Sequence, residues 1–135
     1  MQAEESRPAF YALQPGGWRD YVTLLHPPYT AWHLSYVAIG AALTSAFAWD
    51  RFLPTLVAFA LALGIGAHAL DELNGRPLRT RIPGGVLVAL GVVSIAGAVA
   101  IGVVGGVAVD PWIGVFVVAG AFIVVAYNLE LLGGR

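Results

Sequence analysis

The sequence predicts an all-α membrane protein, and three observations support this prediction. Of the 135 residues, 59% are hydrophobic and only 11% are charged, whereas an average soluble domain is about 25% charged. The mean hydropathy is +0.79. The apolar residues gather in four long runs, each close to the roughly 20 residues that a helix needs to cross a bilayer. Because so few charges cannot cover a soluble surface, we expect these runs to contact the lipid bilayer.

The same composition excludes several classes of protein. The apolar runs are too long for strands and lack the alternation of membrane barrels. The net charge is −1, and seven arginines without any lysine do not supply the basic patch that phosphate neutralisation requires, so we predict no nucleic-acid partner. The chain has no cysteine, which excludes disulfides and thiolate metal sites. The acidic first residues are unlike the basic start of a signal peptide.

Residues 1–29 are predicted to form a polar tail and an interfacial helix. Proline and glycine interrupt the first part of this region. From Trp18 onward, Trp18, Val22 and Leu25 share one helical face. This pattern is typical of a short amphipathic helix that lies in the headgroup layer. The tandem prolines Pro27-Pro28 are expected to end that helix, because they remove backbone donors.

Residues 30–135 are predicted to form a four-span membrane domain, with helices at about 30–49, 53–70, 85–104 and 111–132. The first span is the least apolar, and its His33 and Tyr36 share one face that should line a polar cavity. A simple hydrogen-bonded histidine is the alternative for His33. Gly105-Gly106 is expected to break the third span. Asp110-Pro111 has the cap-plus-proline pattern of a helix start and should begin the fourth.

The placement of arginine predicts how the spans are oriented. With four spans, the N-terminal region, the loop after the second span and the C-terminus lie on one side of the bilayer. That side holds six arginines: Arg7, Arg19, Arg76, Arg79, Arg81 and Arg135. The other side holds only Arg51. The positive-inside rule therefore predicts a multi-pass protein of the cell membrane whose N-terminus and 71–84 loop are cytoplasmic.

The charged stretch from Gly64 to Pro83 is the strongest candidate site. His68, Asp71 and Glu72 have the i, i+3, i+4 spacing of one helix face. Carboxylates at a helix end can bind Mg²⁺, which usually shares its site with substrate phosphates. The following Asn74, Arg76, Arg79 and Arg81 could bind the same phosphates. This combination suits a diphosphate carried by a lipid. The alternative is that these charges are only interfacial anchors and topology signals.

The order of these features resembles the UbiA-type prenyltransferase superfamily. Leu24-Leu25-His26-Pro27 occupies the place of the Leu-Arg-Pro-like segment before the family's first helix. Asp71 looks like the central aspartate of the family's Asn-Asp-x-x-Asp-x-x-x-Asp motif, and Arg76-Pro77-Leu78-Arg79-Thr80 looks like the Arg-Pro-Leu segment that follows it. Tyr127-Asn128-Leu129 is similar to the end of the family's fourth helix. The similarity runs from about Trp18 to Arg135 and corresponds to the N-terminal half of that helical bundle.

The resemblance implies an integral membrane enzyme that transfers a prenyl group from a polyprenyl diphosphate to an acceptor. It implies catalytic roles for Asp71 and Arg76 and Mg²⁺ binding by Asp71 and Glu72. The diphosphate is expected to contact Asn74, Arg76, Arg79 and Arg81. The cavity is expected to be lined by His33, Tyr36, His68, Tyr127 and Asn128. Neutralising the leaving diphosphate would help the allylic carbon–oxygen bond to ionise.

Two alternatives stay open. Ala67 and His68 stand where the family has Asn-Asp, and Gly75 stands where it has the last Asp. This difference favours a non-catalytic lipid-binding or assembly protein on the same scaffold.

A small transporter is disfavoured, because the middle of the third and fourth spans has no ionisable residue. We expect the chain to be a fragment whose bundle is completed by a missing C-terminal half or by a second copy. The acceptor and the prenyl length stay open.

Overall fold

The computed structural model describes residues 7–131 and residue 133, and all regular structure among them is helical. The helices are α1 (Trp18–Leu24), α2 (Pro27–Ala42), α3 (Trp49–Phe59), the π-helix η1 (Ala60–Ala67), α4 (His68–Leu73), α5 (Gly84–Ala108) and α6 (Trp112–Asn128). The three segments α3, η1 and α4 follow one another without a break and form one helix, Trp49–Leu73, which we call the central helix. Residues 1–6 of the predicted tail, residue 132 of the predicted fourth span and Arg135 lie outside the described residues.

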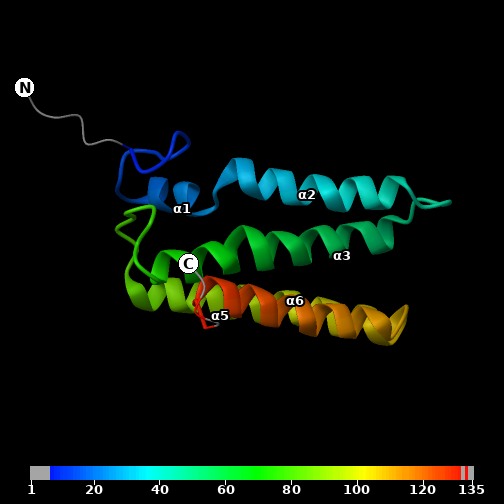
Figure 1. Ribbon diagram of the computed structural model, residues 1–135. Coiled ribbons are helices and arrows are strands. Elements are labelled where there is room, and N and C mark those ends of the chain that lie inside the picture. The colour runs from blue at the N-terminus through cyan, green and yellow to red at the C-terminus, as the bar shows by residue number, and fades with distance from the viewer. Residues whose placement is uncertain (1–6, 132, 134–135) are drawn as a thin grey trace, which may run out of the picture.

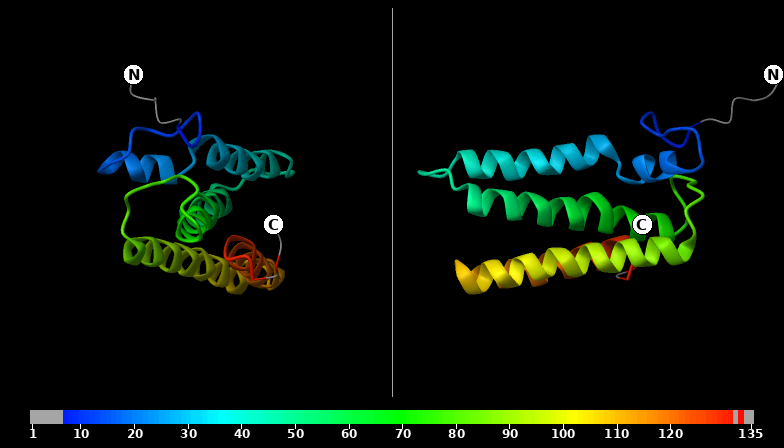
Figure 2. Two further views of the ribbon diagram at one scale, coloured as in Figure 1. Left: turned by 60° about the vertical axis from the view of Figure 1, so that its left-hand side comes forward. Right: turned by 180° about the vertical axis from the view of Figure 1, so that it is seen from behind.

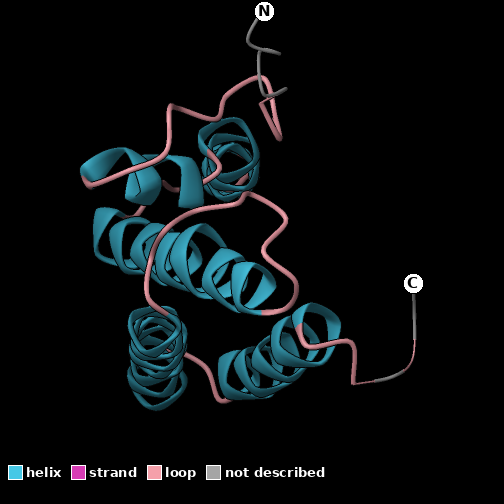
Figure 3. Cartoon of the chain, turned by 90° about the vertical axis from the view of Figure 1, so that its left-hand side faces the viewer, coloured by secondary structure: helices cyan, strands magenta, loops and turns pink. Residues whose placement is uncertain are grey.

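The long helices run side by side in three layers, formed by α2, by the central helix, and by α5 with α6. The central helix lies between α2 on one side and α5 with α6 on the other (Figures 1 and 2). The N-terminal arm, α1 and the loop Asn74–Pro83 gather at one end, which we call the polar end. The α2–α3 and α5–α6 connections lie at the opposite end. Figure 3 looks onto the polar end and shows the loop passing from α4 to the start of α5.

Two helices in the described residues are long and apolar enough to cross a membrane, not the four that the sequence predicted. They are the central helix and α5, each of 25 residues. Helix α2 has 16 residues and ends at Ala42, earlier than predicted. The Thr44 hydroxyl donates to the carbonyls of Ala41 and Ala46, and such local bonds compete with helix continuation. Helix α6 has 17 residues and begins after Asp110, whose carboxylate accepts from Trp112 N at 2.9 Å as a cap does.

The predicted break at Gly105-Gly106 is wrong, because α5 continues to Ala108. A Cβ on Gly106 would lie 3.3 Å from the backbone nitrogen of Gly114 in α6. Gly106 therefore serves close helix approach rather than chain reversal. Pro27 and Pro28 follow the end of α1, as expected, but they also occupy the first turn of α2, where their missing N–H groups cost nothing.

Glycine also lets α5 approach the central helix closely. A Cβ on Gly66 would lie 2.8 Å from Ile95 Cγ1, and one on Gly91 would lie 2.9 Å from Leu70 Cδ2. Gly66 belongs to η1, the π-helical segment directly before His68. A π-helical segment is rare and frequently found near functional sites. Its wider turn changes the direction in which the following residues of α4 point.

The buried hydrophobic cluster of the described residues lies at the polar end, and the buried apolar residue in the middle of α5 is the small Ala98. Leu24, Ala69, Ile82 and Leu87 form one cluster that joins α1, α4, the loop and α5. Many large apolar side chains elsewhere are exposed, such as Phe116 on α6, which is 73% exposed. An apolar surface of this extent suits contact with lipid or with other protein segments.

We predict that Gly102→Ala destabilises the helical bundle by about 1–3 kcal/mol, because a Cβ there would overlap the Val117 side chain of α6 and overpacking has costs of this size. Gly120→Ala is the matched control, since nothing lies within 4 Å of a Cβ at that position. Unfolding in detergent monitored by circular dichroism measures both variants. Equal stability of the two variants would contradict the close α5–α6 contact.

Candidate functional site

The loop Asn74–Pro83 is built around the buried carboxylate of Glu72. The Glu72 side chain is 0% exposed. Its Oε2 accepts from Leu78 N at 2.8 Å, and its Oε1 accepts from both Thr80 N and Thr80 Oγ1 at 2.8 Å. Hydrogen bonds to an ionised acceptor are about twice as strong as neutral ones. Glu72 therefore anchors the middle of the loop to the end of α4.

Arg76 stabilises the same loop from within. Its Nη1 donates to Ile82 O at 2.6 Å and to Thr80 O at 3.3 Å. Gly75 has φ 97°, Arg76 has φ 56° and Arg79 has φ 54°. Non-glycine residues adopt positive φ only where the surrounding structure compensates the strain. The bonds of Glu72 and Arg76 supply that compensation.

Asp20 connects the loop to the N-terminal part of the chain. This side chain is 4% exposed, its Oδ1 accepts from Gly16 N at 3.0 Å, and its Oδ2 accepts from Arg81 N at 3.1 Å. The sequence did not identify Asp20 as important. One feature of the sequence could have indicated its role. Asp20 lies on the polar face of a helix just after Gly16-Gly17, where backbone N–H groups need acceptors.

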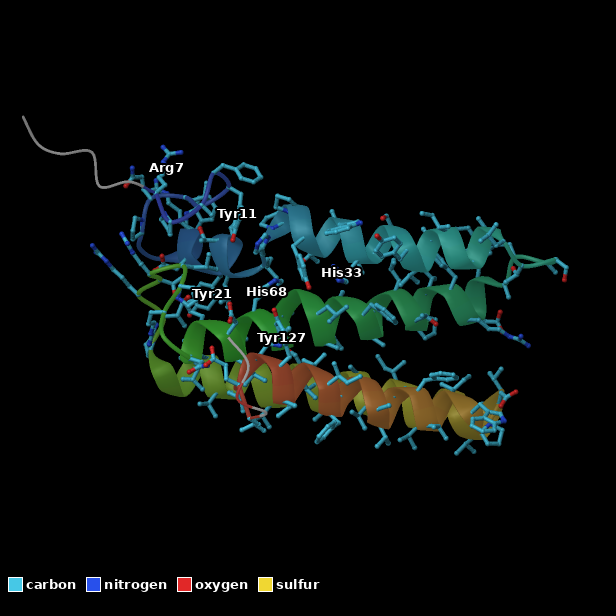
Figure 4. All side chains as sticks on the ribbon, viewed as in Figure 1. Arg7, Tyr11, Tyr21, His33, His68 and Tyr127 are labelled. Atoms are coloured by element: carbon cyan, nitrogen blue, oxygen red, sulfur yellow. The ribbon has the colours of Figure 1, made fainter. Side chains whose placement is uncertain are left out.

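All three histidines of the chain lie in one series of ring contacts. We call Tyr11, His26, Tyr29, His33 and His68 the histidine–tyrosine cluster. The ring centroids are 4.1 Å apart for Tyr11 and His26, 5.2 Å for His26 and His68, 5.3 Å for Tyr29 and His68, and 4.1 Å for Tyr29 and His33. Figure 4 shows Tyr11, His33 and His68 between the N-terminal arm, α2 and the central helix.

The cluster has defined hydrogen bonds. His68 Nδ1 lies 3.0 Å from Gly64 O, and His33 Nδ1 lies 2.9 Å from Tyr29 O. Since a carbonyl only accepts, both rings donate from Nδ1. His26 Nδ1 is buried and has no hydrogen-bond partner among the described residues. The sequence placed His33 and His68 in a cavity, but it did not indicate that Tyr11 and His26 join them.

Burial sets the protonation of two members of the cluster. Desolvation lowers the pKa of His26 below its usual 6.5, although the carboxylate of Asp71 acts in the opposite direction. Desolvation, followed by the charges of Asp71 and Glu72, raises the pKa of Tyr11 above its usual 10.0. Both rings are therefore neutral at pH 7, and both lie within electrostatic reach of Asp71.

The other predicted site residues are divided between the polar end and the helix surfaces. Asn74 Nδ2 donates to Asn128 O at 3.4 Å, so these two residues join the ends of α4 and α6. Arg79 and Arg81 are exposed on the loop. Tyr127 is 78% exposed.

Tyr36 lies one turn of α2 beyond His33, on the side away from the polar end. It lines a groove of about 580 Å³ between α2 and α3, together with Arg51 and Phe52. This groove lies toward the opposite end of the bundle (Figure 1), and neither His33 nor His68 lines it. The ring of Tyr36 nevertheless lies edge-on to His33, with a centroid distance of 6.4 Å, so the groove and the predicted cavity residues meet at this pair.

The donor set for Mg²⁺ is small. Across the described ranges, 7–131 and 133, no group of three or more His, Asp or Glu side chains could hold a metal ion. Both oxygens of Glu72 already accept bonds from the loop, so binding of a metal by Glu72 would require these bonds to be given up. A Mg²⁺ ion held by Asp71 would need phosphates and waters to complete its coordination, which is a usual arrangement for this ion.

We predict that Glu72→Gln lowers the free energy of unfolding by about 2–3 kcal/mol, because hydrogen bonds to charged groups contribute about 1.5–3 kcal/mol each and an amide replaces one acceptor by a donor. The same variant should be cleaved faster by trypsin after Arg79. Asp50→Asn, an exposed carboxylate at the opposite end, is the control. Unchanged cleavage and stability in Glu72→Gln would show that the loop does not depend on this carboxylate.

Comparison of the chain with protein-family models, with curated proteins and with solved structures finds no match. The resemblance to the UbiA-type superfamily therefore depends on the motif residues and their order alone.

Proposed function

We propose that this chain is part of a membrane-embedded, UbiA-like prenyltransferase that binds a polyprenyl diphosphate at its polar end and transfers the prenyl group to an acceptor. One observation carries the proposal. Glu72 and Arg76 hold the loop in a fixed shape from inside, while Arg79 and Arg81 stay exposed on it. Such a loop offers basic side chains to a ligand without first having to become ordered.

The proposal distributes the roles of the charged residues. Arg79 and Arg81 bind the phosphate oxygens. Asn74 contacts the diphosphate from the end of α4. Arg76 keeps the loop carbonyls of Thr80 and Ile82 in place through its Nη1. Asp71 contributes its carboxylate to a Mg²⁺ ion that it shares with the diphosphate, and this ion would neutralise the leaving group. Glu72 acts on the backbone of the loop.

The proposal places the polar end in the cytoplasm and the apolar helices in the membrane. The central helix and α5 supply two spans, and α2 and α6 would cross beside them as shorter or tilted helices. The N-terminal arm, α1 and the loop of the polar end contain Arg7, Arg19, Arg76, Arg79 and Arg81, and the start of α3 at the opposite end contains Arg51. This distribution follows the positive-inside rule.

A non-catalytic protein that binds a lipid diphosphate is the second candidate. The internal bonding of Glu72 favours it, because it leaves the proposed site with one carboxylate, Asp71, where an ion-dependent transferase commonly offers more ligand charge. The binding step is common to both candidates. They differ in whether the bound diphosphate is released.

We predict Mg²⁺-dependent binding of farnesyl diphosphate, used as the probe, to the purified protein in nanodiscs. Calorimetry should show that Asp71→Asn and the double variant Arg79→Gln/Arg81→Gln each raise Kd by about tenfold or more, which corresponds to about 1.4 kcal/mol. Asp110→Asn and Arg51→Gln, at the opposite end, should leave Kd unchanged.

Failure of the unmodified protein to bind, or equal Kd in all four variants, would reject the proposed site. Binding followed by Mg²⁺-dependent release of diphosphate favours the transferase. Binding without release favours the non-catalytic candidate.

We also predict the orientation in the membrane. The chain has no native cysteine, so Ser45→Cys and Pro77→Cys each introduce one thiol at an exposed position without changing the charge. A membrane-impermeant thiol reagent should label Ser45→Cys in intact cells and should label Pro77→Cys only after permeabilisation. The reverse pattern, or labelling of both in intact cells, would contradict this orientation.

A further inference from the structure

We propose that the N-terminal arm, Arg7–Gly17, is a pH-sensitive cover of the polar end, which neutral His26 and His68 hold closed and which is released when both imidazoles are charged. This inference goes beyond prenyl transfer and does not depend on it. It arises from how the arm is attached and from what that attachment contains.

The arm is fixed to the bundle by a small number of contacts. Ala12 is 1% exposed, and Leu13 N donates to Thr23 Oγ1 at 3.0 Å. The ring of Tyr11 packs on His26 with a centroid distance of 4.1 Å. The imidazole of His26 in turn stacks on His68 at 5.2 Å with an angle of 25° between the rings. His26 therefore lies between the arm and α4 and connects the arm to the central helix.

Protonation acts on this connection in two ways. Two imidazolium ions stacked at this distance repel each other, and partial burial strengthens the repulsion. In addition, His26 Nδ1 is buried without a partner in the described residues. A doubly protonated ring must carry a hydrogen on that atom, so a donor would be left unsatisfied. His68 already donates from Nδ1 to Gly64 O, and its second proton would be added on Nε2.

The neighbouring groups cannot neutralise both charges. The arm contributes Tyr11, α2 contributes Tyr29 and His33, and α4 contributes His68 and Asp71. The Asp71 carboxylate interacts favourably with one imidazolium. His33 would add positive charge near His68. Glu72 also acts electrostatically on Tyr11, but its oxygens are bonded to the loop.

The sign of the pH dependence follows from the direction of the His26 shift. Burial lowers the pKa of this ring below 6.5, so the closed arm favours the neutral form. The stabilisation is complete above pH 6.5 and is lost as the pH falls through the lower pKa of the closed state.

Thiol labelling of the full chain in nanodiscs tests the cover. Ala12→Cys places a thiol at a position that is buried in the closed arm, and Phe10→Cys places one at a position that is 84% exposed in the same arm. The protection is measured as the labelling rate of the Phe10→Cys thiol divided by that of the Ala12→Cys thiol. Because pH changes the reactivity of both thiols, this ratio cancels that effect. Over a range from about pH 7.5 to about pH 5.5, we expect the protection of the Ala12→Cys thiol to be constant above about pH 6.5. Below about pH 6.5 it should fall by about tenfold for each pH unit and proton taken up.

Histidine variants identify the groups responsible. His26→Gln and His68→Gln should each flatten the pH dependence, and His33→Gln, whose ring contacts Tyr29 rather than His26, should retain it. The proposal would be overturned if the protection of the Ala12→Cys thiol stayed constant across this pH range. It would also be overturned if this protection changed equally with pH in all three histidine variants. Chymotrypsin cleavage after Tyr11 in the unmodified protein, relative to a peptide of residues 7–17, is a second measure that needs no cysteine variant. A cleavage ratio independent of pH would also overturn it.

Discussion

The polar end of this protein depends on the buried carboxylate of Glu72. A charge inside a protein is tolerated only when hydrogen bonds replace its hydration. All three donors that Glu72 receives come from two residues of one loop, Leu78 and Thr80. If the loop moved away, the charge would lose its partners, so the loop and the end of α4 form one unit. The same bonds bring Ile82 into the core beside Ala69 and Leu87.

The two ends of the bundle consequently differ in their physical character. At the polar end, short irregular segments are held together by hydrogen bonds that Asp20 and Glu72 accept, by those that Arg76 donates, and by a small core. Away from it, the helices meet through glycine contacts such as those of Gly66 and Gly91 and expose apolar surface. Close backbone approach is typical of helix association in lipid, where apolar burial contributes little. Ligand recognition is therefore expected at the end that has fixed polar geometry.

The sequence predicted correctly that the chain is helical, but it predicted four membrane-length helices where two are present in the described residues, and it predicted few of the polar contacts. Long apolar runs determine where helices form, whereas local hydrogen bonds determine where they stop, as Thr44 does after α2. Gly105-Gly106 was expected to break α5, but close packing against α6 retains the helix there. His68, Asp71 and Glu72 were placed on one face from their spacing. Asp71 and Glu72 are adjacent and lie about 100° apart around a helix, and Glu72 serves the loop while His68 joins the cluster. The contact between Tyr11 and His26 depends on the path of the arm, which no periodic pattern reveals.

Hydrogen exchange at the backbone amides of Leu78 and Thr80 tests most directly whether Glu72 holds the loop. If it does, both amides are protected without any ligand, and Mg²⁺ with farnesyl diphosphate leaves their exchange rates unchanged. If Glu72 instead leaves the loop to bind the ion, the addition of Mg²⁺ and the diphosphate accelerates exchange at both amides. Fast exchange of both amides in the absence of ligand would equally contradict a loop that is built before the ligand binds.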